Sequence, residues 1–379
     1  MAPASRGPLA DIRVIEVGHI LAGPFAGMLL ADLGADVIKV EPATGDLSRK
    51  VRSHTIDGHS TYFASVNRNK RSIHLDLATD EGQRQLGALA ETAQALIANL
   101  RPSAIRELGL DYASLRRFNE RIVCVAITAY GLDGPGADRT AFDYVVQATS
   151  GVASMTGEPG GPPVLAGYPA VDNSTGIMAA LGLVAKVLDG TGGQVDISLF
   201  ETMLAQMNYR AAAYLNAGAV PERHPLGAHS FYVPAQLFAT ADGHLALFVT
   251  HDEFWQRCCT ALDRPAWATD ARFATIDARA ANRDELIPLL SARLLESSTH
   301  EWVTRLQAQG VPAGPVHDLG EALDGDVTRA RGTIVAVDTA DGPLRMVGNP
   351  IRIEGFTPSY RVAPRLHEHT DEVLRDLTE

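Results

Sequence analysis

The stretch DIRVIEVGHILAGPFAGMLLADLGADVIKVE (residues 11–41) decides the fold class. Residues 12–17 form an apolar, β-branched run, which predicts a strand. A Gly-Pro pair then opens an apolar run that ends at Gly34, and this predicts a helix because proline is favoured in the first helical turn and glycine just past the helix end. Residues 36–41 predict a second strand, so the stretch forms one β-α-β unit.

Strand-like and helix-like runs go on alternating up to residue 217, which indicates an α/β fold with a parallel sheet covered by helices on both faces. Further strands are expected at residues 72–77, 95–99, 122–129 and 194–198. Further helices are expected at residues 80–92, 103–109, 144–155, 174–188 and 201–217. The turn after the first strand lacks the Gly-x-Gly-x-x-Gly order that lets the backbone approach a pyrophosphate, so a nicotinamide oxidoreductase is disfavoured.

The pattern changes near residue 218, where a polar, proline-containing linker begins. Two strand-like runs beyond it flank Asp242-Gly243, a typical hairpin signal, and helix-like runs follow at residues 252–262, 282–295 and 299–308. We therefore expect a large domain at residues 1–218, a small α+β domain at residues 219–325, and a C-terminal segment at residues 326–379 that returns to the large domain.

Composition narrows the function classes. The chain has 379 residues, a length that suggests two domains, and its net charge of −12 without a broad basic face argues against a nucleic-acid partner. Its three cysteines, Cys124, Cys258 and Cys259, form no Cys-x-x-Cys, so we expect no zinc site or disulfide framework, and a reducing cytoplasm fits. The start lacks the apolar core of a signal peptide and no run approaches 18 apolar residues, so we expect no membrane span.

Asp172 is the leading candidate for a catalytic group. It lies in GYPAVDNSTG (residues 167–176), directly before a long apolar helical run, and no other charge occurs from Gly161 up to it. Backbone N–H groups at a helix start favour an ionised carboxylate and can hold a developing oxyanion, which suits a nucleophile or a base. The alternative from this segment alone is a structural helix cap, because Asp is a preferred N-cap residue.

Basic residues gather near two expected strand ends. Lys70 and Arg71 precede one strand, while Asn99 and Arg101 follow another, with Arg106 one turn further on. Such groups can form a phosphate site on an acidic protein, because clefts outside strand ends are where open α/β sheets bind ligands. Each residue taken alone could equally be a solvated loop charge.

Several short motifs, in this order, resemble those of the class III coenzyme A transferases. They occupy residues 9–17, 22–24, 33–41, 45–46, 69–73, 142–151 and 363–370, so the resemblance covers nearly the whole chain. It implies a Rossmann-like large domain built from both chain ends, a smaller domain, and a homodimer whose two subunits interlock.

The resemblance also implies chemistry. The family's nucleophilic Asp falls at Asp172, which would attack an acyl-CoA thioester to form a mixed anhydride, then an aspartyl-CoA thioester, and finally pass CoA to a small carboxylic acid. Coenzyme A and acyl-CoA are then substrates, and no metal or permanently bound cofactor is needed. Water must be excluded, because both intermediates hydrolyse.

Matching the motifs residue by residue assigns further roles. The thiol end of CoA is expected at Ile20, Leu21 and Ala22. The CoA phosphates are expected at Asn99, Arg101 and Arg106. Pro42 stands where several members carry an Arg that stacks on adenine, so adenine is expected at Lys70, Arg71 or Arg139. The family's glycine-rich cover loop corresponds to Gly227, Ala228 and His229, which include one glycine.

Two alternatives remain open. An α-methylacyl-CoA racemase shares the fold, but its proton-transferring His would stand at Phe142, which cannot move a proton. A non-catalytic CoA-binding protein is the alternative from another class, and it predicts that replacing Asp172 changes no activity.

Overall fold

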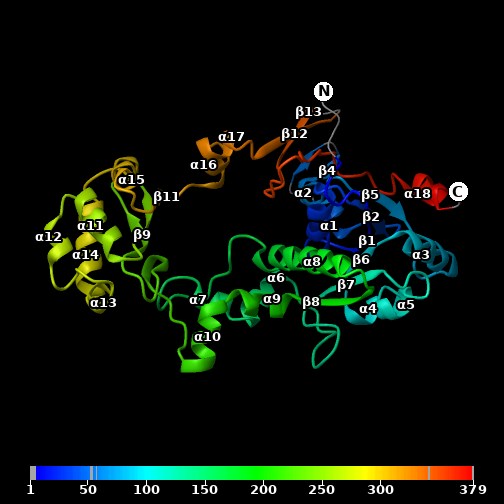
Figure 1. The fold of residues 1–379 in the computed structure, drawn as a ribbon, viewed down its shortest axis with the longest axis horizontal. Coiled ribbons are helices and arrows are strands. Elements are labelled where there is room, and N and C mark those ends of the chain that lie inside the picture. The colour runs from blue at the N-terminus through cyan, green and yellow to red at the C-terminus, as the bar shows by residue number, and fades with distance from the viewer. Residues whose placement is uncertain (1–5, 52–53, 57, 340–341, 378–379) are drawn as a thin grey trace. The chain divides into compact units, whose positions relative to one another are not determined.

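A computed structural model describes residues 6–51, 54–56, 58–339 and 342–377 (Figure 1). The chain divides into two compact units. The first comprises the described residues of Met1–Ser150, Ala166–Ala211 and Asp326–Glu379, and the second comprises Gly151–Leu165 and Ala212–Gly325. Residues 1–5 and 378–379, which the sequence assigns to the large domain, lie outside the described residues.

A six-stranded parallel sheet forms the centre of the first unit, in the order β5-β2-β1-β6-β7-β8. The strands are β1 (Arg13–Gly18), β2 (Asp36–Glu41), β5 (Arg71–His74), β6 (Ala95–Asn99), β7 (Val123–Thr128) and β8 (Gly193–Ser198). Strands β1, β2, β6 and β7 are buried along almost their whole length, as strands inside a parallel sheet are, although β1 and β2 also bury the charged residues Glu16, Lys39 and Glu41. The predicted α/β class is confirmed.

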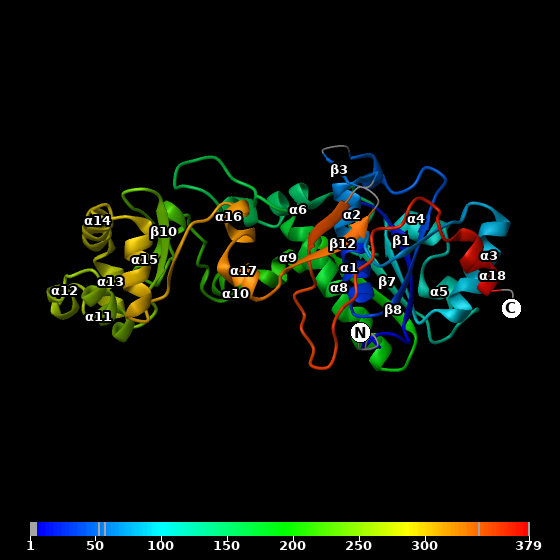
Figure 2. The same ribbon diagram turned by 90° about the horizontal axis from the view of Figure 1, so that it is seen from above.

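Helices cover both faces of this sheet. On one face α1 (Ala22–Asp32) packs against α8 (Ala170–Leu188). On the other face lie α3 (Asp80–Thr92), α4 (Pro102–Glu107), α5 (Tyr112–Leu115) and α18 (Thr370–Asp376), which share one hydrophobic core with the strands and lie together, away from α8, in both ribbon views (Figure 2).

The remaining elements of the first unit are short or peripheral. They are the 3-10 helix η1 (Leu47–Lys50), strands β3 (Thr55–Ile56) and β4 (His59–Ser60), helices α2 (Thr61–Asn67), α6 (Asp143–Thr149), α9 (Leu199–Gln206) and α17 (Asp326–Ala330), and the hairpin β12 (Ile334–Thr339) and β13 (Gly342–Val347). The C-terminal segment reaches the sheet edge, where the backbone N–H of His369 donates to the Ser72 carbonyl.

The strand order creates a crevice between β1 and β6. The chain leaves β1 toward β2 on one side and leaves β6 toward β7 on the other, so the two connections diverge above adjacent strand ends. Open α/β sheets bind ligands at such a switch point, outside the carboxyl ends of the strands.

The second unit contains a three-stranded antiparallel sheet in the order β11-β10-β9 and a separate hydrophobic core. Its strands are β9 (Ala235–Ala239), β10 (His244–Phe248) and β11 (Ala313–Pro315). Its helices are α7 (Val152–Met155), α11 (Asp252–Ala261), α12 (Ala266–Thr269), α13 (Ile276–Ala281), α14 (Arg283–Leu294), α15 (Thr299–Ala308) and α16 (Leu319–Leu323), with the 3-10 helix η2 (Pro225–Gly227). The Asp242-Gly243 hairpin forms as predicted, closed by the bond from Thr240 N–H to the Gly243 carbonyl.

The boundaries differ from those expected. Gly151–Leu165, placed by sequence in the large domain, belongs to the second unit, and so do residues 212–218. The single helix expected at residues 201–217 is interrupted at Asn208, whose φ of 28° does not continue a helix, so α10 (Asn208–Ala217) is a separate element.

Helix α8 also departs from the expectation about membranes. It has 19 residues and a mean hydropathy of 1.3, so by length and composition alone it could cross a membrane. The sequence prediction counted uninterrupted apolar runs, whereas the mean hydropathy averages the many Ala, Val, Ile and Leu residues of α8 with its polar residues, including Asp172 and Lys186. A single such helix is weak support for a span, and α8 packs on α1, β7 and β8.

Candidate active site

Asp172 lies in the first turn of α8 and lines a pocket of about 400 Å³ on the first unit. The other walls include residues 19–22, 99–102 and 127–129, which stand at or just beyond the carboxyl ends of β1, β6 and β7. The pocket therefore occupies the crevice at the switch point.

The environment of Asp172 favours the protonated acid. Burial raises the pKa of Asp172 to about 7, and the negative charge of Asp143 acts in the same direction. The expectation that the helix start favours the ionised form is therefore wrong here. The backbone N–H groups of Val171 and Asp172 are already bonded to another carboxylate, and both burial and the charge of Asp143 raise the pKa of Asp172.

Asp143 caps α8, although it belongs to α6. Its Oδ2 accepts hydrogen bonds from the backbone N–H groups of Val171 at 2.8 Å and Asp172 at 3.1 Å, and its Oδ1 accepts one from the Gln147 amide at 2.6 Å. The N-cap position is Pro169, which has no side-chain cap, so the alternative that Asp172 itself caps the helix is wrong. Sequence analysis missed Asp143 because the only signal was its place within the family motif at residues 142–151.

The turn between β1 and α1 forms another part of the pocket wall. Ile20, Leu21 and Ala22 all line the pocket, and their role at the thiol end of CoA stays a prediction. In the described part of the chain, the backbone N–H groups of Leu21 and Ala22 have no hydrogen-bond acceptor. Asn99 lies against this turn so closely that a Cβ on Gly23 would stand 2.7 Å from the Asn99 Cβ, which explains glycine there.

The residues predicted to hold the CoA phosphates do not all lie together, and Arg139, which was predicted for adenine, lies with two of them. Arg101 and Arg139 line the Asp172 pocket with Asn99, and neither arginine forms an ion pair among the described residues. Arg106 does not join them: its guanidinium donates to the Leu132 carbonyl at 2.6 Å and to Asp133 at 2.8 Å, and it lines a different pocket.

The prediction that Lys70 or Arg71 holds adenine is wrong. The side chain of Lys70 is fully buried, and its ammonium lies 2.7 Å from Glu16 Oε2. Arg71 begins β5, at the amino end of the strands, where it pairs with Asp36 at 2.6 Å. Lys70 is therefore buried in the core, and Arg71 lies at the amino ends of the strands, whereas the Asp172 pocket lies at their carboxyl ends.

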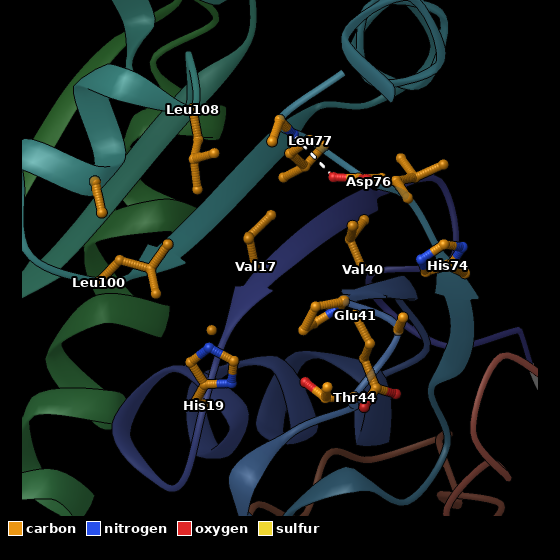
Figure 3. A pocket seen from close by; sticks show the side chains of 16 residues that line it. Val17, His19, Val40, Glu41, Thr44, His74, Asp76, Leu77, Leu100 and Leu108 are labelled. Carbon is orange, nitrogen blue, oxygen red and sulfur yellow. Dashed lines mark hydrogen bonds between the residues drawn. The ribbon is translucent and has the colours of Figure 1, made fainter. Parts of the chain in front are cut away.

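A second pocket of about 470 Å³ adjoins the first and shares His19, Leu100 and Ala104 with it (Figure 3). Val17, Val40, Leu77, Leu100 and Leu108 point into it, so its walls are mainly apolar. Pro42 also lines this pocket. Burial lowers the pKa of His19, and its Nδ1 is buried without a hydrogen-bond partner in the described residues.

Tyr62 in α2 is a further residue that sequence analysis missed. Its pKa is raised, chiefly by burial and next by the negative charge of Asp172. The phenol therefore lies within electrostatic range of the candidate nucleophile, although no sequence pattern pointed to it.

The predicted cover loop belongs to the second unit. Gly227 has a φ of 68°, a conformation suited to glycine, and Ala228 is buried. His229 is held by its backbone N–H, which donates to the Ala235 carbonyl at 2.8 Å, and by Arg283, which donates to the His229 carbonyl at 2.7 Å. Among the residues that the structure describes, no group of three or more His, Cys, Asp or Glu side chains could hold a metal ion.

Proteins of known family with a similar sequence over the whole chain are coenzyme A transferases. The family model for CoA-transferase family III matches residues 9–370, and the chain belongs to this family. The resemblance noted in the sequence is confirmed, and the protein is an enzyme that transfers coenzyme A, with CoA thioesters as substrates.

Relatives extend over the whole chain. The succinate–glutarate CoA-transferase of Agrobacterium fabrum is 37% identical, covering 99% of this chain and 97% of the relative. The acetyl-CoA:oxalate CoA-transferase of Acetobacter aceti is 33% identical, covering 96% and 94%. A CAIB/BAIF family protein from Brucella suis has the same fold, with a TM-score of 0.85, 32% identity and coverage of 98% of this chain and 100% of that one.

Proposed function

We propose that Asp172 is the nucleophile of this enzyme and carries CoA between two carboxylic acids. The observation that supports this most directly is a carboxyl group with a pKa of about 7, enclosed in a pocket at the switch point of the sheet. Near neutral pH a substantial fraction is ionised, and the partial desolvation that raises its pKa also leaves the anion more reactive.

The steps balance as follows. A carboxylate oxygen of Asp172 attacks the thioester carbonyl carbon, the C–S bond breaks, and CoA thiolate leaves behind a mixed anhydride. The thiolate attacks the aspartyl carbonyl and releases the donor acid, which gives an aspartyl-CoA thioester. The acceptor carboxylate displaces the thiolate in turn, and thiolate attack on the second anhydride forms the new acyl-CoA and restores Asp172.

The turn between β1 and α1 is assigned the negative charge that develops in these steps. Each attack turns a carbonyl oxygen into an oxyanion, and the N–H groups of Leu21 and Ala22 at the start of α1 are donors without a partner in the described residues. Helix starts carry partial positive charge, so the proposal assigns the oxyanion to these two groups.

The two adjoining pockets suit the rest of the CoA molecule. We assign the pyrophosphate to Arg101 and Arg139, because guanidinium groups bind phosphate through paired hydrogen bonds. The mainly apolar second pocket, with Pro42 in its wall, is assigned to adenine in place of Lys70 and Arg71. His19, at the junction, offers its unpartnered ring nitrogen to an amide of the pantetheine arm.

Dicarboxylic acids are the proposed acyl groups, with succinyl-CoA as donor and glutarate as acceptor. The support is the 37% identical relative named for succinate and glutarate. The racemase alternative is disfavoured by Phe142, which lines the Asp172 pocket where that chemistry needs a proton-transferring group.

A homodimer is proposed as the working form. Helix α8 exposes Ile177, Leu181 and Leu188, with exposed fractions of 52%, 62% and 81%, and no residue of α10 is buried. Such apolar faces mark protein interfaces in soluble proteins. Light scattering after size exclusion tests this: a monomer at micromolar concentration would contradict it.

Mass spectrometry of the intact protein tests the nucleophile. After incubation with succinyl-CoA the proposal predicts an adduct equal to CoA less one water, which hydroxylamine converts to a hydroxamate at Asp172. Asp172→Asn should give neither product, whereas Asp189→Asn, at the other end of α8, should give both. An adduct on another residue would contradict the assignment.

A further inference from the structure

A buried carboxylate, Asp46, contacts the turn between β1 and α1, which lines the same pocket as Asp172. Its Oδ1 accepts the backbone N–H of Ile20 at 3.2 Å, and its side chain is fully buried. The next residue, Leu47, lines the Asp172 pocket together with Ile20. Asp46 therefore adjoins two parts of the pocket wall without being one of the lining residues.

Ile20 has an unusual backbone conformation. Its φ is +69°, a region in which β-branched residues are rare because the Cβ crowds the backbone. Strain of this kind persists only where the surroundings enforce it, and it concentrates at functional sites. The hydrogen bond that the Ile20 N–H donates to Asp46 is the one hydrogen bond between the Ile20 backbone and a side chain in the described residues.

Buried charges fix Asp46 in turn. Its Oδ2 lies 2.8 Å from the Lys39 ammonium, and its Oδ1 also accepts from the Ser48 backbone N–H at 2.8 Å and the Ser48 hydroxyl at 2.7 Å. Lys39 is itself held by Glu16 at 2.9 Å and by the Gly18 carbonyl at 3.1 Å. Lys39 thus contacts both the end of β1, through the Gly18 carbonyl, and the Asp46 carboxylate that accepts the Ile20 N–H.

Stability alone is a poor reason for such a network. Removing two charges from water costs about as much as their attraction returns, so buried ion pairs contribute little net stability, while they can impose one geometry. The contacts at Gly18 and Ile20 lie on either side of His19, directly before the N–H groups of Leu21 and Ala22.

We propose that Asp46 is a positioning residue: with Lys39 it holds Ile20 in the left-handed conformation that aims the start of α1 at the reacting carbonyl. This inference rests on the proposed function of Asp172. Asp46 does not touch substrate, and it acts through the backbone of the turn.

The test compares Asp46→Asn with Asp32→Asn. Asp32 forms an equally buried ion pair with Arg68 at 2.6 Å in the same unit but lines none of the site, so it is a matched control for lost stability. With succinyl-CoA and glutarate, kcat of Asp46→Asn should fall on the order of 100-fold, the usual effect of a misplacement of about 1 Å. Asp32→Asn should lower the thermal midpoint similarly and keep kcat within about threefold.

A double-mutant cycle with Ile20→Gly separates positioning from general damage. Glycine adopts positive φ without strain, so Asp46→Asn should lower kcat far less in the Ile20→Gly background than in the wild type. Additive losses, or equal losses of kcat in Asp46→Asn and Asp32→Asn, would overturn the proposal.

A crystal structure of Asp46→Asn gives a readout that needs no activity. Ile20 should relax to a negative φ, and an unchanged φ would overturn the proposal. Failure of the wild type to form the Asp172 adduct would instead refute the proposed function, while the φ of Ile20 would still report whether Asp46 holds the turn.

Discussion

Replacing Asp172 by Asn should make the protein more stable as it destroys activity, and the gain should grow with pH. The pKa of Asp172 is about 7 in the folded protein, against an ordinary value of 3.8. The difference of roughly three units corresponds to about 4 kcal/mol, at about 1.4 kcal/mol per unit. The folded state therefore favours the protonated acid.

The sign of the pH dependence follows from linkage. Below pH 3.8 the Asp172 carboxyl is protonated in both the folded and the unfolded state, and its contribution to the free energy of unfolding is most favourable. This contribution is lost as pH rises, and the loss is complete just above pH 7. At pH 5 the wild type has lost about 2 kcal/mol and at pH 8 about 4 kcal/mol, whereas Asp172→Asn loses nothing at this position. The stability gap between variant and wild type should widen by about 2–3 kcal/mol over that interval.

Urea unfolding at pH 5 and pH 8 measures this gap, with far-UV circular dichroism as the probe. All tryptophans, Trp255, Trp267 and Trp302, belong to the second unit, so their fluorescence serves as an internal reference that should respond less to residue 172. Asp189→Asn is the matched control: Lys186 lowers the pKa of that exposed carboxyl below its ordinary 3.8, so it is ionised in both states from pH 5 to pH 8 and its gap from wild type should stay constant. A gap between Asp172→Asn and wild type that stays constant with pH would refute the reasoning.

Three further outcomes follow from the site. In Asp143→Asn the acid limb of the pH profile of kcat/KM should move to lower pH, because one cause of the raised Asp172 pKa is gone. The limb should stay above an ordinary carboxyl pKa, since burial is the larger cause. An unmoved limb would show that Asp143 does not raise the pKa of Asp172. Ala104→Phe should raise KM for succinyl-CoA on the order of tenfold and leave KM for glutarate within about twofold, as steady-state kinetics would show, because Ala104 lies where the two pockets meet. Gly27→Ala should destabilise the first unit by about 2 kcal/mol or more, measured by urea unfolding, because its Cβ would stand 2.0 Å from the buried Glu16 Oε2.

Sequence reasoning succeeded where the signal is local. The strand at Asp36–Glu41 and the helix at Asp80–Thr92 agree with prediction residue for residue, because alternation, caps and breakers all lie within the element. Family motifs placed Asp172 beside Ile20, Leu21 and Ala22 in one pocket. The family resemblance indicated that these residues are neighbours in space, although they lie far apart in the sequence.

The failures share one cause, which is distance along the chain. Asp143 accepts hydrogen bonds from the N–H groups of a helix that begins 27 residues later, and Lys70 pairs with Glu16, which lies 54 residues earlier in the chain. Charges that look available in a linear sequence are neutralised by partners that only the fold supplies. The direction of the Asp172 pKa shift could not be predicted for the same reason.

The crevice between β1 and β6 arises from how the chain is connected, not from any side chain that lines it. A crevice that is set by chain connectivity persists when the side chains that line it are substituted. We therefore expect that enzymes with this fold can change which organic acid they accept by point substitutions at the rim of the crevice. The proposed position of coenzyme A, which is common to every acyl-CoA substrate, would stay the same.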